Sequence, residues 1–112
     1  MTSRLLISEM HGLAGRAGEL QGLLDELAAG ARGEDGCLTF SVSRHAQVGE
    51  FVVISHWRDE EALRRHFRGD AYERYRAAVD ELLARPSNVT VHHVAQSVHA
   101  IDPDLPDPGL LG

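Results

Sequence analysis

Two kinds of apolar spacing take turns along this chain, and their order limits the folds that it can adopt. In some segments apolar and polar residues alternate, as in half-buried β-strands; in others apolar residues recur every three or four positions, as in amphipathic helices. The order predicts strand, helix, strand, strand, helix and strand. With right-handed crossovers this arrangement gives an α+β fold of the ferredoxin-like βαββαβ type, a four-stranded antiparallel sheet with helices on one face.

The alternating segments predict strands at residues 4–11, 37–44, 50–57 and 88–98. In the second of these, Leu38, Phe40 and Val42 alternate with polar residues and should share the buried face. The third is apolar on both faces from Phe51 to Ile54, so we expect a central strand or one that is covered on both sides. The residues between these two strands, 45–49, have the length of a hairpin loop.

The helical segments are marked by an apolar stripe and by signals at their ends. The first is predicted over residues 13–32, and the turn after it over residues 33–36. Its stripe is formed by Leu20, Leu23, Leu24, Leu27, Ala28 and Ala31. Asp59 is the predicted N-cap of the next helix. Asp70 and Glu73 have the spacing of a capping box, which predicts the start of a further helix.

The length of the chain, 112 residues, is enough for one domain and too short for two. We expect that domain over residues 1–98 and an extended, proline-rich tail over residues 99–112. A domain of this size buries a modest share of its surface, and the predicted sheet has apolar residues such as Val52 and Ile54 on its second face. A second copy of the chain would cover that face, which predicts a homodimer.

Charge, hydropathy and cysteine content exclude several classes of partner. The formal net charge is −6, whereas a nucleic-acid-binding surface needs a basic patch. No apolar run approaches the roughly 20 residues of a membrane-spanning helix, and the N-terminus lacks the apolar stretch of a secretory signal. Cys37 is the only cysteine and cannot form an internal disulfide, which favours a reducing, cytoplasmic location.

Two segments resemble motifs of the antibiotic biosynthesis monooxygenase family. Residues 34–40, EDGCLTF, are similar to its P-G-C-L-x-Y/F segment. Residues 56–72 are similar to its signature x-W-x-s/d-x-E-A-L-x-x-H-x-x-s-x-x-Y/F. The order of the predicted elements extends the resemblance over about residues 4–96. It implies a dimeric α+β barrel, in which two chains bring their sheets together.

The resemblance also implies a small enzyme that oxidises a phenol, quinol or anthrone-like substrate to a quinone with dioxygen and without a metal, flavin or other cofactor. Some relatives degrade haem, act on autoinducer-type molecules or have no known activity, so the family alone does not fix the reaction. Oxygenases of the family typically place an asparagine near the tryptophan or in the first strand, and this chain has none there. We therefore predict a cofactor-independent monooxygenase. The alternatives are a haem-binding or haem-degrading protein and a non-catalytic, ligand-binding stress-response dimer.

His66 and Trp57 are the predicted catalytic residues. His66 lies on the apolar side of its helix, where a histidine is either a packed core residue or a base that takes a phenolic proton near neutral pH. Trp57 ends the third strand and is either a core or interface side chain or a ring that stacks on a flat substrate. The end of that strand and the following helix should bracket a cavity between the sheet and the helices.

Six further side chains are predicted to contact the substrate: Tyr72, Tyr75, Phe40, Phe51, Ser55 and His93. The two tyrosines occupy the buried face of their helix, where they either pack or bond a substrate oxygen. His92 and His93 are neighbours in a strand, so they face opposite sides of the sheet and only one can join a given site. No histidine pair has the spacing of a strong metal motif, so no metal site is predicted.

Overall fold

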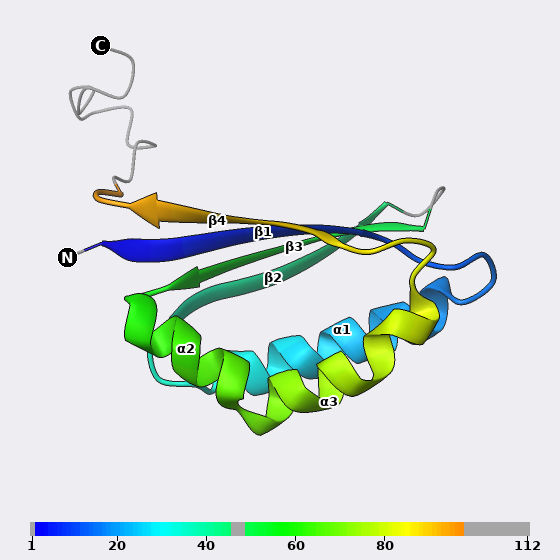
Figure 1. Ribbon diagram of the computed structural model, residues 1–112, viewed down its shortest axis with the longest axis horizontal. Helices are drawn as coiled ribbons and strands as arrows, with labels where there is room; N and C mark the ends of the chain where they lie inside the picture. The colour runs from blue at the N-terminus through cyan, green and yellow to red at the C-terminus, as the bar shows by residue number, and fades with distance from the viewer. Residues whose placement is uncertain (1, 46–48, 98–112) are drawn as a thin grey trace, which may run out of the picture.

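Four strands form one antiparallel sheet, and the described helices all lie against one of its faces (Figure 1). The computed structural model describes residues 2–45 and 49–97. The strands are β1 (Ser3–His11), β2 (Cys37–His45), β3 (Glu50–Trp57) and β4 (Asn88–Val94), in the order β2-β3-β1-β4. The helices are α1 (Ala17–Arg32), α2 (Glu60–Arg68), α3 (Asp70–Val79) and the 3₁₀ turn η1 (Asp80–Leu82). The predicted α+β fold of the ferredoxin-like type is confirmed.

Some of the predicted boundaries fall outside this description or differ from it. The tail expected at residues 99–112, and with it the division of the chain after residue 98, lies outside the described residues. The fourth strand ends at Val94, earlier than predicted. Within the described ranges, no helix is long and apolar enough to cross a membrane.

β3 lies between β2 and β1 and carries a deeply buried face of the sheet. Its alternate residues Phe51, Val53, Ser55 and Trp57 are buried on the side of the helices. The residues between them point to the opposite side, where Ile54 is 38% exposed because no described helix covers that side (Figure 1). The prediction of a central strand is therefore confirmed.

The apolar stripe of α1 closes the core from the helix side. Leu20 and Leu24 are completely buried, and burying a leucine fully is worth about 1.5–3 kcal/mol relative to leaving it exposed. Of the predicted stripe, Leu23 alone is only partly buried and packs at the edge of the core. α1 begins at Ala17, later than predicted, because Gly15 adopts a left-handed φ of +81° that a right-handed helix does not contain.

A bulge near the start of β2 changes one of the predicted faces. Between Cys37 and Thr39 the register of β2 against β3 shifts, so Leu38 is an extra residue in its strand. Leu38 is 55% exposed, whereas Phe40 is buried. The expectation that Leu38 shares the buried face with Phe40 and Val42 is wrong, because an extra residue interrupts the period-2 alternation on which it depends.

Both α2 and α3 begin where predicted, but only α2 has the predicted side-chain cap. The side chain of Asp59 accepts a hydrogen bond from the backbone N–H of Ala62 at 2.8 Å, which confirms Asp59 as an N-cap and lowers the pKa of its carboxyl. Asp70 is the first residue of α3, and the N-cap is Gly69, which has no side chain that could accept a hydrogen bond. The predicted capping box is wrong because the backbone N–H of Glu73 donates to the carbonyl of Gly69 at 3.1 Å instead.

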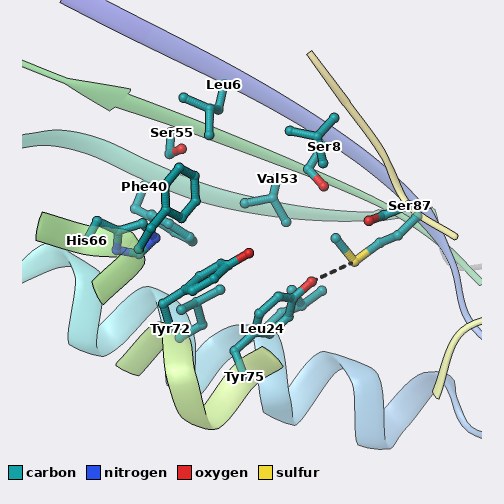
Figure 2. Close-up of a pocket in the computed structure, with 14 residues that line it drawn as sticks. Leu6, Ser8, Leu24, Phe40, Val53, Ser55, His66, Tyr72, Tyr75 and Ser87 are labelled. Carbon is teal, nitrogen blue, oxygen red and sulfur yellow. Dashed lines mark hydrogen bonds between the residues drawn. The ribbon is translucent and has the colours of Figure 1, made fainter. Parts of the chain in front are cut away.

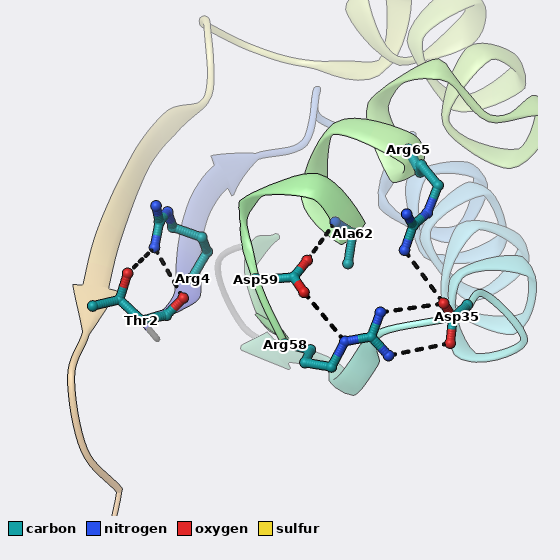
Figure 3. Close-up of polar contacts among 7 residues, drawn as sticks. All are labelled: Thr2, Arg4, Asp35, Arg58, Asp59, Ala62 and Arg65. Carbon is teal, nitrogen blue, oxygen red and sulfur yellow. Dashed lines mark hydrogen bonds and ion pairs between the residues drawn. The ribbon is translucent and has the colours of Figure 1, made fainter.

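Ion pairs connect the turn after α1 to the start of α2 (Figure 3). The guanidinium of Arg58 donates to both carboxylate oxygens of Asp35 at 3.2 Å, which lowers the pKa of the Asp35 carboxyl. It also donates to Asp59 at 3.3 Å, and Arg65 donates to Asp35 at 3.3 Å. Such exposed pairs contribute little stability, but they fix how the turn meets the helix.

Gly36 allows the same turn to approach α2 closely. Its φ is +85°, a left-handed conformation that favours glycine. A Cβ atom at this position would overlap the Cβ of Ala62. The backbone carbonyl of Gly36 also accepts a hydrogen bond from the N–H of Arg58 at 2.8 Å. Both the conformation and the contact therefore require the smallest residue at this position.

We expect Gly36→Ala to lower the free energy of unfolding by about 2–5 kcal/mol, because the left-handed conformation costs about 1–2 kcal/mol and the overlap adds about 1–3 kcal/mol. Gly15→Ala is a matched control: Gly15 has nearly the same φ, but a Cβ there would meet no atom within 4 Å, so only the first cost applies. Urea denaturation of both variants measures the difference. Equal losses would show that the turn does not press on α2.

Candidate functional site

A cavity of about 310 Å³ lies between the helix-covered face of the sheet and the helices (Figure 2). Strands β1 and β3 supply one wall, and α2 and α3 supply most of the opposite one. The residues that line it include Leu6, Ser8, Leu24, Phe40, Val53, Ser55, His66, Tyr72 and Tyr75. The predicted cavity between the sheet and the helices is thus present in the fold.

The size and lining of this cavity favour a flat, uncharged molecule. An apolar cavity of about 150 Å³ holds a benzene ring, so about 310 Å³ leaves room for roughly two or three fused rings. Within the described part of the chain, no Asp, Glu, Lys or Arg side chain lines the cavity. Its polar groups are serine and tyrosine hydroxyls and one imidazole, which can bond to oxygen atoms of a neutral ligand.

The imidazole belongs to His66, which α2 presents to the cavity. His66 is only 4% exposed, and its Nδ1 atom lies 2.6 Å from Oε1 of Glu34 in the turn after α1. A carboxylate can only accept a hydrogen bond, so Nδ1 carries the proton that is shared with Glu34. Nε2 makes no hydrogen bond with any described residue. In the neutral ring it is therefore a free acceptor for a proton.

Aromatic rings hold the imidazole of His66 from several sides. The indole of Trp57 stacks on it with ring centroids 4.4 Å apart. The ring of Tyr72 meets it edge-on at 5.4 Å, and those of Phe40 and Phe67 lie at 6.0 Å and 5.5 Å. Contacts of this kind contribute beyond simple burial and restrict the rotation of the ring.

Of the eight residues predicted for the site, the structure brings five to the cavity wall: Phe40, Ser55, His66, Tyr72 and Tyr75. Trp57 and Phe51 are buried in the core and do not line the cavity. Trp57 lies against the ring of His66, so the expectation that it stacks directly on a substrate does not match its position. Its indole N–H is buried and has no hydrogen-bond partner among the described residues.

His93 also lies away from the cavity. It pairs with Arg4 across β1 and β4, which places it on the same face of the sheet as the cavity. However, β4 contributes Val89 to the wall, and His93 is four residues further along, about 13 Å away at the usual strand rise. His93 is exposed there. A strand pattern predicts the face of a residue but not how far the helices extend along that face.

The hydroxyl groups in the wall differ in their partners. The hydroxyl of Tyr75 donates to the sulfur of Met10 at 3.8 Å, and burial raises the pKa of Tyr75 to about 12. The hydroxyls of Ser8 and Ser55 make no hydrogen bond with the described residues and lie on the opposite wall from the ring of Tyr72 (Figure 2). A ligand between these walls can therefore be bonded from both sides.

Glu34 is the residue that the sequence pattern did not single out. It is 32 residues away from His66 in the chain, and the motif that residues 34–40 resemble assigns no role to the glutamate. No sequence motif contains both residues, so neither periodicity nor residue spacing could have predicted their contact. Among the described residues, no group of three His, Cys, Asp or Glu side chains lies close enough to hold a metal ion.

The family model described as antibiotic biosynthesis monooxygenase matches residues 5–78 of this chain. The matched range includes most of β1 and α3 and all of the elements between them. Glu34, His66, Tyr72 and Tyr75 all fall within it.

Relatives in sequence and in structure agree with that match. A Mycobacterium tuberculosis protein named "Putative monooxygenase Rv0793" is 42% identical over 72 residues, which are 64% of this chain and 71% of that protein. The solved structure of Rv0793 has a TM-score of 0.78 at 34% identity and covers 88% of this chain and 98% of its own. The crystal structure of PA3566 from Pseudomonas aeruginosa has a TM-score of 0.73 at 28% identity, with 88% and 97% covered.

We expect Tyr75 to ionise late in an alkaline titration of tyrosinate absorbance. Burial raises its pKa from 10.0 to about 12, so its contribution to stability is present below about pH 10 and is lost as the pH rises through about 12. Tyr75→Phe should remove this late step. A Tyr75 that ionises near pH 10 in the folded protein would show that its hydroxyl is in contact with water.

Proposed function

Since this chain belongs to the antibiotic biosynthesis monooxygenase family, we propose that it is a cofactor-independent monooxygenase that oxidises a phenol, quinol or anthrone-like molecule to a quinone with dioxygen. One observation carries the proposal. A histidine with a free ring nitrogen forms part of the wall of an apolar cavity that has the volume of a small polycyclic aromatic molecule. General acid–base catalysis needs a titratable group within reach of the proton that moves.

The proposed reaction uses the electrons of the substrate. Nε2 of His66 removes the proton of a phenolic or enolic hydroxyl, and the resulting anion passes one electron to dioxygen. The substrate radical and superoxide then combine to form a carbon–oxygen bond. The carbon atom loses its hydrogen as a proton, the O–O bond breaks, and the outer oxygen leaves as hydroxide, which the protonated His66 converts to water. One oxygen atom ends in the new carbonyl and the other in water, so no further reductant is consumed.

The cavity wall would assist this reaction by orienting the ring and excluding water. The hydroxyls of Ser55 and Tyr72 can hold oxygen atoms of the substrate in front of His66, since all three residues line the same cavity. The ring of Phe40 adds an apolar surface for a flat molecule. Trp57 would act indirectly, because its stacking holds the imidazole at a fixed angle.

The two alternative functions have less support in the cavity. Haem is much larger than two or three fused rings and carries two carboxylates, whereas the cavity of about 310 Å³ has no cationic side chain among its described lining residues. A purely structural or ligand-storing role would not need a histidine with one nitrogen bonded and the other free. Addition of haem without a Soret shift would exclude the first alternative.

The lone cysteine fits a reducing environment, and we infer a cytoplasmic location for the protein. Cys37 is partly buried, and burial together with the negative charge of Glu34 raises the pKa of its thiol. Its thiolate form is therefore scarce near neutral pH, which makes a nucleophilic role for Cys37 unfavourable.

The outer face of the sheet supports a homodimer. Leu5 and Ile7 of β1 lie beside Val52 and Ile54 of β3 on this face, with Ile7 directly opposite Ile54. The described helices are all on the other side, so no element among residues 2–45 and 49–97 covers this apolar surface (Figure 1). Apolar side chains that gather on an open sheet face often mark interfaces, and an identical sheet is a self-complementary partner.

We expect Ile54→Glu to convert the dimer to a monomer in sedimentation velocity at micromolar concentration, because it places a charge at the centre of the apolar outer face. Leu13→Glu is the matched control, since Leu13 is similarly exposed, at 37%, but lies beyond the end of β1. This control should remain a dimer. A wild-type protein that sediments as a monomer would overturn the proposed assembly.

We expect His66→Gln to lower turnover of an active quinol or anthrone by about 10²–10⁴-fold in an oxygen-uptake assay, the usual contribution of a positioned acid or base. Glutamine can fill the site but cannot take the proton. His11→Gln is the matched control, because His11 contacts Arg85 and Glu50 and does not line the cavity. Wild-type turnover by a folded His66→Gln protein would remove His66 from the reaction.

A further inference from the structure

We infer that Glu34 is a positioning residue for His66: it holds the ring proton on Nδ1 and thereby keeps Nε2 free to act in the cavity. The inference rests on the proposed function, because it names the group that prepares the proposed base. The sequence motifs place Glu34 in a turn and give it no role. Its role follows from where the fold puts its carboxylate.

The contact between the two side chains is short and sheltered. Oε1 of Glu34 lies 2.6 Å from Nδ1 of His66, and the side chains are 26% and 4% exposed. A hydrogen bond to an ionised acceptor is stronger than one between neutral groups, and it is stronger still where water is excluded. Neutral imidazole carries a single proton, so a proton kept on Nδ1 leaves the lone pair on Nε2.

The backbone of the turn holds Glu34 in place for this contact. The N–H of Glu34 donates to the carbonyl of Ala31 at 3.0 Å, and its carbonyl accepts from the N–H of Cys37 at 3.2 Å. The second carboxylate oxygen, Oε2, lies beside Gly69, where a Cβ atom would come within 3.2 Å of it. The carboxylate is thus seated between His66 and the junction of α2 and α3.

Orienting the ring of His66 does not require Glu34, so the contact is better explained by its effect on the imidazole tautomer. The orientation of the ring is already restricted by the stacked indole of Trp57 at 4.4 Å and by the edge of Tyr72 at 5.4 Å. What these apolar contacts cannot determine is which nitrogen carries the proton. Only a hydrogen-bonding partner sets that, and Glu34 is the partner that the described residues provide.

The tautomer can be measured without a substrate, which separates this inference from the proposed function. In protein labelled with nitrogen-15 at histidine, long-range proton–nitrogen correlations at mildly alkaline pH show which ring nitrogen carries the proton. The signals of His66 are assigned by their loss in His66→Gln. We expect a protonated Nδ1 in the wild type, and a transfer of the proton wholly or partly to Nε2 in Glu34→Ala.

Two further variants keep the experiment decisive. Glu34→Leu fills the same space without an acceptor and should show the same transfer, so it replaces Glu34→Ala if that variant does not fold. Glu61→Ala is the matched control, because it removes an exposed carboxylate from the first turn of α2. It should keep the wild-type tautomer. A proton that remains on Nδ1 in the folded Glu34 variant overturns the inference.

Kinetics give a second readout if a substrate is found. A residue that acts through His66 should lower turnover by about tenfold or more when replaced, and its effect should vanish once His66 is already absent. Glu34→Ala combined with His66→Gln should therefore be no slower than His66→Gln alone. If the two losses multiply, Glu34 acts independently of His66 and the inference fails. If no variant changes turnover while the tautomer still shifts, the proposed role of His66 fails instead.

Discussion

Apolar contact between the stripe of α1 and the inner face of the sheet is the interaction on which the other features of this fold depend. Leu20 and Leu24 are completely buried against strands whose own inner residues, such as Met10 and Phe51, are almost fully buried. This contact determines which face of the sheet receives helices and which remains open. It also sets the distance between the layers, and α2 and α3 must then pack in the space that remains.

The cavity exists because that remaining space is not filled. β1 and β3 present the small side chains of Ser8 and Ser55 where larger apolar residues would otherwise meet the helices. On the opposite side, the hydroxyl of Tyr75 reaches Met10 of β1, whereas the ring of Tyr72 lies apart from Ser8 and Ser55 on the facing wall (Figure 2). An unfilled apolar cavity lowers the stability of a core, since its lining atoms lose packing contacts. Keeping one next to a buried histidine is more consistent with ligand binding than with stability.

Sequence patterns were accurate where the interacting residues all lie within one short segment. The alternation of β3, the stripe of α1 and the side-chain cap of Asp59 each depend on residues a few positions apart. The patterns failed where one extra residue shifted the alternation of a strand, and where a helix included the residue that was expected to cap it. Leu38 is exposed because a bulge breaks the alternation, and Asp70 begins its helix instead of capping it. A period identifies an element, but it does not report local changes of register.

The sequence by itself therefore determined the order of the elements, the buried stripe of α1, the central place of β3 and the presence of His66 on the apolar side of its helix. Only the tertiary structure decided that Glu34 binds His66, that Trp57 packs behind the imidazole, and that the helices leave His93 uncovered. The physical reason is the range of the interactions. Periodicity shows which residues of one segment are removed from water, and that information is local to the segment. The site depends instead on a contact between residues 32 positions apart, which only the packing of the turn against the helix brings together.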